Sequence, residues 1–117
     1  MSEVRRGDLW LINFDPTIGH EIQKARPGVI IQNDIGNKYS SLTIVAPVTS
    51  QHTEKVYPIE VFLDQQQGLP KNSKVLLNQI RAVDKQRLIK KLGRLSHERI
   101  SDVNQALKIS LGLVEID

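Results

Sequence analysis

Cysteine is absent from the 117-residue sequence, and so is any long apolar run. Without cysteine, neither a disulfide framework nor a thiolate metal site can form. No apolar run approaches the ~18 residues that a membrane-spanning helix needs. The first six residues turn polar again too soon to hold the core of a signal peptide. These absences lead us to expect a cytoplasmic protein.

Aromatic residues are scarce, and the three histidines stand apart. Phe, Trp and Tyr make up 4% of the chain, which argues against a nucleic-acid binder built mainly on base-stacking side chains. His20, His52 and His97 form no i, i+4 pair, and no group of carboxylates has the spacing of metal ligands. A glycine-rich phosphate loop and a nucleophile elbow are missing too. We therefore expect neither a metal nor a cofactor.

The overall balance of residues is that of one globular domain, which we expect to span residues 1–117. Hydrophobic residues make up 39% and charged residues 25% of the chain, and a split would leave halves too small for ordinary cores. The net charge is +3, with a pI near 9.3. That excess fits a polyanionic partner such as nucleic acid, but many domains carry as much for solubility alone.

Most of the chain has the pattern of short strands. Apolar or alternating segments bounded by Pro, Gly, Asn and Asp predict strands over residues 9–14, 27–32, 42–48, 57–63, 73–80 and 88–95. Residues 16–26 carry no apolar periodicity and predict a long polar loop. Residues 33–38 predict a turn, because Asn, Asp and Gly tolerate positive φ. Residues 84–87 predict a single helical turn.

The end of the chain changes to a helical period. Ser96 is the predicted N-cap. Apolar residues then recur at spacings of three and four, which is typical of one helical face: Ile100, Val103, Leu107, Leu111 and Val114. The fold class is therefore mainly β with a C-terminal α-helix, as a compact barrel or a strongly curved sheet with the helix packed on it.

Two polar strand ends are the candidate functional site. Arg26 immediately precedes Pro27, which favours an extended conformation at the start of the second strand. Thr49, Ser50 and Gln51 end the third strand. If these consecutive strands pair antiparallel, Arg26 and Thr49 become neighbours. A guanidinium beside a hydroxyl can bind a phosphate. The competing interpretation, which spacing alone favours, is an arginine that fixes a loop by donating to backbone carbonyls.

Several motifs, in order and with matching spacing over nearly the whole chain, resemble the MazF/PemK family of toxins, most closely its Gram-positive branch. They are Arg6-Gly7-Asp8-Leu9-Trp10, residues 15–21 (Asp-Pro-Thr-Ile-Gly-His-Glu), Arg26-Pro27, residues 32–37 (Gln-Asn-Asp-Ile-Gly-Asn), residues 46–51 (Ala-Pro-Val-Thr-Ser-Gln), residues 75–81 (Val-Leu-Leu-Asn-Gln-Ile-Arg) and Asp84-Lys85-Gln86-Arg87.

The resemblance implies an SH3-like (CcdB/MazF-type) barrel and a homodimer. It also implies a sequence-specific endoribonuclease that cleaves single-stranded RNA without a metal and is neutralised by a MazE-like antitoxin. The family's catalytic arginine and threonine correspond to Arg26 and Thr49. Arg26 would stabilise the charge of the phosphate, and Thr49 would donate a hydrogen bond to it. Glu21 is either a general base or an acceptor for a base edge, because the guanidinium of Arg26 stays protonated.

Further polar residues are expected to contact the RNA bases. Amide side chains offer both donors and acceptors to splayed bases. These amide side chains and the polar residues near Arg26 and Thr49 in the sequence make up the predicted RNA-binding set: His20, Glu21, Asn33, Ser50, Gln51 and Gln79. His20 and Asn78 depart from the residues expected in the family, which leads us to expect a different recognised sequence.

Two alternatives use the same fold. One is a toxin that binds a protein, like the CcdB inhibitors of DNA gyrase; the other is a non-catalytic module that binds RNA or antitoxin. The presence of Arg26 and Thr49 argues against the first, since a gyrase binder has no use for that pair.

Overall fold

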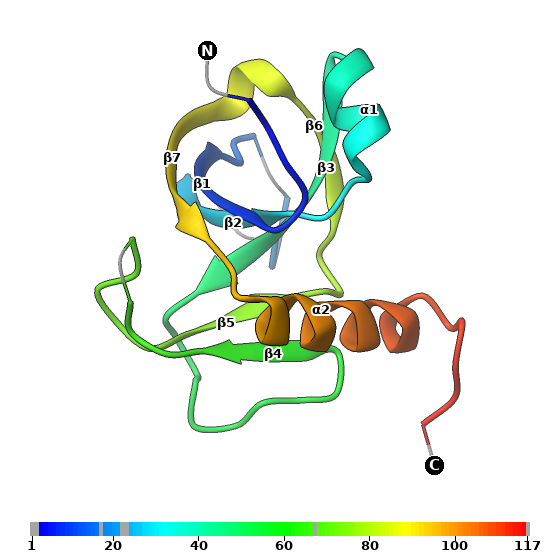
Figure 1. The fold of residues 1–117 in the computed structure, drawn as a ribbon. Coiled ribbons are helices and arrows are strands. Elements are labelled where there is room, and N and C mark those ends of the chain that lie inside the picture. Colours follow the sequence, from blue (N-terminus) through cyan, green and yellow to red (C-terminus); the bar gives the residue numbers. More distant parts are fainter. Residues whose placement is uncertain (1–2, 17, 22–23, 67, 117) are drawn as a thin grey trace.

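The computed structural model describes residues 3–16, 18–21, 24–66 and 68–116. Most of the secondary-structure elements are strands, and the last element is a helix (Figure 1). In chain order the elements are β1 (Asp8–Asn13), β2 (Ala25–Ile30), α1 (Asp34–Tyr39), β3 (Leu42–Thr49), β4 (Glu60–Leu63), β5 (Ser73–Leu76), β6 (Arg81–Asp84), the 3₁₀ turn η1 (Lys85–Arg87), β7 (Leu88–Arg94) and α2 (His97–Ser110).

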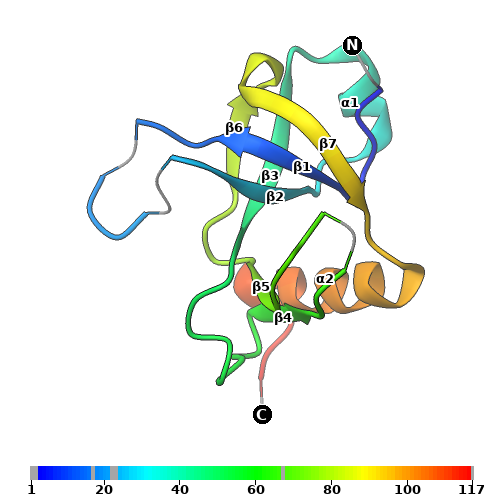
Figure 2. The same cartoon turned by 90° about the vertical axis from the view of Figure 1, so that its left-hand side faces the viewer.

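The strands form one antiparallel sheet in the order β4-β5-β3-β2-β1-β7, with β6 attached to β3. β3 organises the sheet because it has three partners. Residues 42–45 pair with β6, residues 45–47 with β2, and residues 48–49 with β5. In Figure 2, β1 lies between β2 and β7, and α2 runs beside β4 and β5. The prediction of a mainly β fold with a C-terminal helix is confirmed.

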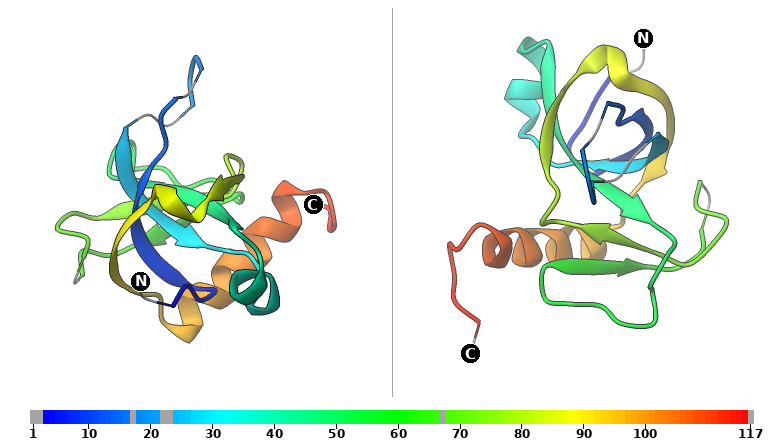
Figure 3. Two further views of the ribbon diagram at one scale, coloured as in Figure 1. Left: turned by 90° about the horizontal axis from the view of Figure 1, so that it is seen from above. Right: turned by 180° about the vertical axis from the view of Figure 1, so that it is seen from behind.

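Alternation along the strands creates two cores, one on each face of the sheet. On β1, Leu9 faces one side while Trp10 and Ile12 face the other, as the two-residue period of a strand requires. The helix-side core joins Leu9 to side chains of β2, β3, β4, β5 and α2, among them Val103. The second core joins Trp10 and Ile12 to β2, β3, β6 and β7, which curve around it (Figures 1 and 3).

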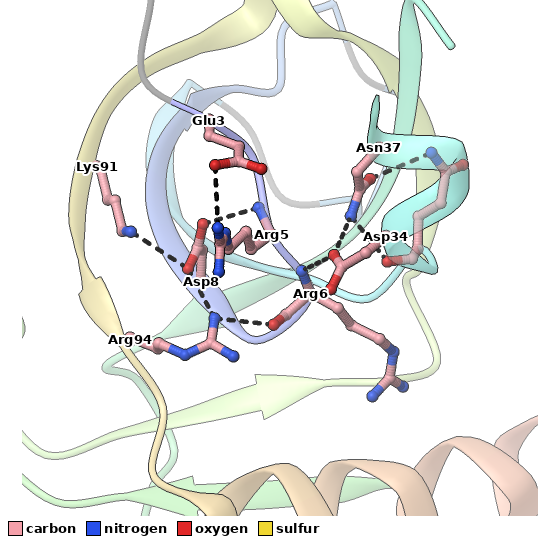
Figure 4. A network of polar contacts seen from close by, with 9 residues as sticks. Glu3, Arg5, Arg6, Asp8, Asp34, Asn37, Lys91 and Arg94 are labelled. Atoms are coloured by element: carbon pink, nitrogen blue, oxygen red, sulfur yellow. Dashed lines mark hydrogen bonds and ion pairs between the residues drawn. The ribbon is translucent and has the colours of Figure 1, made fainter. Parts of the chain in front are cut away.

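A polar network fixes the segment before β1 (Figure 4). The carboxylate of Asp8 is wholly buried, accepts hydrogen bonds from Arg94 Nη1 and the Arg5 amide, each at 2.9 Å, and lies 3.4 Å from Lys91 Nζ. Asp34 accepts from the Arg6 amide at 2.6 Å. That backbone hydrogen bond is the main reason why the pKa of Asp34 lies below its ordinary value. The network joins β1 to β7 and to α1.

The segment predicted as a turn, residues 33–38, instead contains the helix α1. The residues of this segment have low helix propensity, but hydrogen bonds cap both ends of the helix. The Asn33 side chain accepts from the Gly36 amide at 2.8 Å and caps the helix. Asn37 is buried: its amide nitrogen donates to the Gln32 carbonyl at 2.9 Å, and its oxygen accepts from Thr43 at 2.7 Å. Tertiary hydrogen bonds therefore outweigh local propensity here.

The strand predicted over residues 73–80 is wrong beyond Leu76. The chain turns there, with the Gln79 amide donating to the Leu76 carbonyl, and β6 follows as a separate strand that the sequence pattern did not predict. β6 exists because it pairs with the first half of β3. The strand predicted over residues 57–63 starts only at Glu60, since residues 57–60 form a turn.

The C-terminal helix begins as predicted and ends earlier. Ser96 caps it by accepting from the Arg99 amide. Gly112 adopts φ +72°, and the Gly112 and Leu113 amides donate to the Ile109 and Lys108 carbonyls, the hydrogen bonds of a Schellman end. Leu111 and Val114, predicted in the apolar stripe, therefore lie past the helix. Within the described residues, no helix is both long enough and apolar enough to cross a membrane.

Candidate functional site

The start of β2 and the end of β3 lie beside each other. Their register pairs Gly28 with Pro47, and Arg26 and Thr49 each lie two residues beyond that pair in their own strand. β2 begins at Ala25, two residues before the predicted start of this strand, and it includes Arg26, which is half-buried. The direct contact between Arg26 and Thr49 stays a prediction.

The hydroxyl of Thr49 is oriented by its own chain. Thr49 is 8% exposed, and its Oγ1 accepts a hydrogen bond from the Gln51 amide at 3.1 Å. A hydroxyl has one proton to donate besides its acceptor positions. The backbone bond occupies an acceptor position of the Thr49 hydroxyl and does not use its proton.

A cleft of about 250 Å³ borders this strand end on one side. Arg26 and Ser50 line it together with Lys71, a cation that the sequence analysis did not select. Its other lining residues are mostly apolar: Pro27, Val48, Leu69, Pro70 and Ser73. Lys71 stands in a segment that, by its composition, resembles an ordinary polar turn, so the sequence carries no signal for its position beside Arg26.

A second cleft, of about 430 Å³, borders the strand end on the other side. Glu21 and Gln79 line it, with Arg81, which the sequence analysis quoted within a motif without giving it a role. The remaining lining residues are Phe14, Pro16, Ile18, Pro47, Asn78 and Ile80. Pro47 lines this cleft and Val48 the other, and consecutive residues of a strand face opposite sides. The two clefts therefore flank the β2–β3 pair.

Two arginines from the far part of the chain hold the connection between β1 and β2. Arg81 Nη1 donates to the Phe14 carbonyl at 2.9 Å, and Arg87 Nη1 donates to the carbonyls of Asn13 and Asp15. Residues 17, 22 and 23 of this connection lie outside the described residues. Within the described ones, the Glu21 carboxylate accepts from the Ile18 amide, which fixes the carboxylate at the cleft.

The other predicted RNA-binding residues are distributed differently. His20, in the connection between β1 and β2, and Gln51, after β3, are exposed and line neither cleft. Asn33 follows β2 at its opposite end, roughly 20 Å from Arg26 at the ordinary rise of a strand, and its side chain caps α1. The structure therefore does not bring Asn33 to Arg26 and Thr49. Within the described residues, no three His, Asp or Glu side chains gather as metal ligands would.

This sheet with one C-terminal helix is the fold of MazF toxins. MazF from Deinococcus radiodurans superposes with a TM-score of 0.83 at 29% identity, covering 96% of this chain and 99% of that one. A MazE–MazF complex from the same organism superposes with a TM-score of 0.76 at 26% identity, covering 96% and 98%.

Sequence comparison gives the family. The family model described as "PemK-like, MazF-like toxin of type II toxin-antitoxin system" matches residues 5–111, and this chain belongs to that family. Endoribonuclease EndoA of Bacillus subtilis is 42% identical over 113 residues, which are 96% of this chain and 97% of that protein. The family expected from the sequence motifs is confirmed.

Proposed function

We propose that this chain is the toxin of a type II toxin–antitoxin system and acts as a sequence-specific, metal-independent endoribonuclease on single-stranded RNA. The observation that carries the proposal is the 42% identity to a protein named as an endoribonuclease, across nearly the full length of both chains. Its activity comes to this chain through family membership over residues 5–111. A gyrase inhibitor of the same general fold has no comparable support.

The proposed reaction is a transesterification within the RNA. The 2′-oxygen of the ribose attacks the adjacent phosphorus, and the bond from phosphorus to the 5′-oxygen breaks. The 2′-hydroxyl loses its proton, and the leaving 5′-oxygen gains one. The products are a 2′,3′-cyclic phosphate and a 5′-hydroxyl. The chemical demand on the protein is to stabilise the extra negative charge on the phosphate oxygens and to move two protons.

Arg26 and Thr49 are the proposed catalytic residues. Arg26 donates charged hydrogen bonds to the phosphate oxygens as their charge grows. Thr49 donates its remaining hydroxyl proton to one of the same oxygens, an assignment supported by the bond that Thr49 Oγ1 already accepts from Gln51. Glu21 is the candidate base, since it is a carboxylate at a cleft beside the strand end.

The RNA would follow the two clefts across the strand end. Ser50 and Lys71 contact it from the cleft of Arg26, and Gln79 from the cleft of Glu21. His20 and Gln51 are exposed beside this path and reach bases that are splayed out of a single strand. Asn33 is left out of the proposed contacts because its side chain oxygen caps α1.

The partners follow from the family. A cognate MazE-like antitoxin covers the toxin, in keeping with the MazE–MazF complex among the structural relatives. The protein acts in the cytoplasm as a homodimer of single-domain chains, residues 1–117. Its sheet is an SH3-like barrel of the CcdB/MazF type, an interpretation supported by the curvature of β1, β2, β3, β6 and β7 around Trp10 and Ile12.

Cleavage of a long single-stranded RNA by the purified protein in EDTA tests the function. We expect discrete fragments whose new ends can be labelled by polynucleotide kinase without prior dephosphorylation, because they carry a 5′-hydroxyl. RNA that stays intact in the presence of the purified protein would refute the proposal. Fragments that carry 5′-phosphates would refute it too. Inhibition of DNA gyrase by the same preparation, with RNA intact, would favour the protein-directed alternative.

A further inference from the structure

A lysine is buried beside the candidate catalytic threonine. Lys74 of β5 is 5% exposed, an unusual position for a lysine unless its ammonium is paired. Its Nζ donates to Glu60 Oε1 at 2.9 Å and to the Lys55 carbonyl at 3.1 Å. The Glu60 side chain is 10% exposed, so both charges of this ion pair are largely removed from water.

The pair lies one strand away from the proposed chemistry. The register of β3 and β5 sets Lys74 opposite Thr49, and that of β4 and β5 sets it opposite Phe62. Residues directly opposite in an antiparallel pair project from the same face. Thr49 and Lys74 are therefore side-chain neighbours on one face of the sheet, although the burial of Lys74 keeps its ammonium from meeting an RNA directly.

The same two side chains hold the segment that follows Thr49. Residues 50–59 connect β3 to β4 and begin with Ser50 and Gln51. Glu60 Oε1 accepts from the Tyr57 amide at 3.0 Å, and the Lys74 ammonium binds the Lys55 carbonyl. The Tyr57 ring lies over the pair, with its centroid 5.9 Å from Lys74 Nζ. One carboxylate and one ammonium thus fix the far end of this segment.

Stability alone does not explain an ion pair in this place. Desolvating two charges costs about as much as their attraction returns, and apolar side chains of similar size often serve stability as well or better. An apolar pair would, however, donate nothing to the Lys55 carbonyl. What the charged pair adds is a set of directed bonds to the Lys55 carbonyl and the Tyr57 amide in the segment after Thr49.

We propose that Lys74 and Glu60 are positioning residues that hold Thr49, Ser50 and Gln51 in the geometry required for cleavage. The proposal rests on the endoribonuclease function proposed above. A displacement of about 1 Å at a reacting group can lower a rate by about 100-fold. Loss of the pair should therefore lower kcat through Thr49, whereas KM should change only as far as the proposed RNA contacts of Ser50 and Gln51 weaken.

Four variants separate positioning from simple stability. Lys74→Met removes the cation and leaves the Glu60 carboxylate buried alone. The double variant Lys74→Met/Glu60→Leu removes both charges and should recover the melting temperature. Glu60→Gln keeps an acceptor for the Tyr57 amide but no charge for Lys74. Lys90→Met is the matched control, since Lys90 is an exposed lysine on β7.

We expect kcat to fall by about tenfold to 100-fold in Lys74→Met and in the double variant, with KM within about threefold, and to stay at the wild-type value in Lys90→Met. The kcat of Glu60→Gln should lie between that of Lys74→Met and that of Lys90→Met. A double variant that melts like the wild type and also cleaves like it would overturn the proposal, since the pair would then serve stability only. A loss confined to KM would overturn it too.

Amide hydrogen exchange provides a readout that does not depend on cleavage. In the double variant, the Tyr57 and Gln51 amides should exchange at least about tenfold faster, while amides of the β1–β2 pair keep their protection. Unchanged exchange at Tyr57 and Gln51 would overturn the positioning role. If the wild-type protein fails to cleave RNA, the proposed function falls, and the exchange measurement still decides whether Lys74 and Glu60 hold this segment.

Discussion

At the Ile30 end of β2, polar side chains bond to one another and to the backbone, whereas at the Arg26 end they line clefts. Asp8, Asp34 and Asn37 each have two or more protein hydrogen bonds or ion pairs (Figure 4). At the other end, Thr49 keeps a proton to donate, and Ser50 and Gln51 are exposed. The same kinds of side chain therefore stabilise the fold at one end, and at the other they are the proposed contacts of a substrate.

The largest expected effect is on activity, at the Arg26 end. Arg26→Ala removes the charged donors to the phosphate and should lower kcat/KM by about 100- to 1,000-fold, the usual cost of losing one group that stabilises developing charge. Far-UV circular dichroism and the melting temperature should change little, because Arg26 is only half-buried at a strand start. Single-turnover cleavage of a labelled RNA measures the rate. A variant that cuts at near-normal rate would remove Arg26 from the catalytic set.

The matching change at the Ile30 end should affect stability instead. Asp8→Ala removes a wholly buried acceptor of bonds from Arg5 and Arg94. The two cations left behind, Arg94 and Lys91, are 47% and 39% exposed and can be hydrated, so we expect a loss of about 2–3 kcal/mol rather than more. Urea unfolding measures this loss of stability. At a temperature well below melting, kcat should stay at the wild-type value.

Glu3→Ala is the control for Asp8. The Glu3–Arg5 pair is 71% and 59% exposed, and such a pair contributes little. Equal destabilisation by Asp8→Ala and Glu3→Ala would contradict the role given to the buried carboxylate.

Removal of the Thr49 hydroxyl should lower activity less than removal of the Arg26 guanidinium does. Thr49→Val keeps the shape and removes one hydrogen bond to a charged phosphate oxygen, which corresponds to about a tenfold to 100-fold loss in kcat. Thr49→Ser keeps the hydroxyl and should retain most of the activity. The comparison of the two cleavage rates isolates the hydroxyl from packing. A serine variant as slow as the valine variant would show that the methyl group, and not the hydroxyl, matters at this position.

Local sequence signals are stronger at the Arg26 end than at the Ile30 end, for a physical reason. Local signals at the Arg26 end come from strands of regular pattern, from the proline after Arg26 and from the polar residues after β3. The predicted contact between Arg26 and Thr49 requires only that two consecutive strands pair. α1 depends on Asn37 bonding to Gln32 and Thr43, and β6 depends on pairing with β3. These contacts join segments whose own sequences resemble turns, so no local pattern reveals them.

Some signals were present in the sequence and were not used. Gly112 sits where helices commonly end, and it would have excluded Leu111 and Val114 from the helix. Lys71 and Lys74 carried no comparable signal. Both stand in a polar stretch typical of a turn, yet one lines the cleft of Arg26 and the other is buried beside Thr49.

The smallest expected effect is the pH dependence of the Ile30 end. The Arg6 amide, bonded to the Asp34 carboxylate, lowers the pKa of Asp34 below its ordinary value of 3.8. The folded protein therefore binds this proton less readily than the unfolded chain. The stability that Asp34 contributes is present in full above pH ~4 and is lost as the pH falls through the lower, folded-state pKa. Asp34→Asn should remove that contribution, so the two urea midpoints should differ most above pH ~4 and converge as the pH falls through the lowered pKa of Asp34. A difference that grows on acidification would mean that the folded protein raises this pKa, and the bond from Arg6 would not be the dominant influence on Asp34.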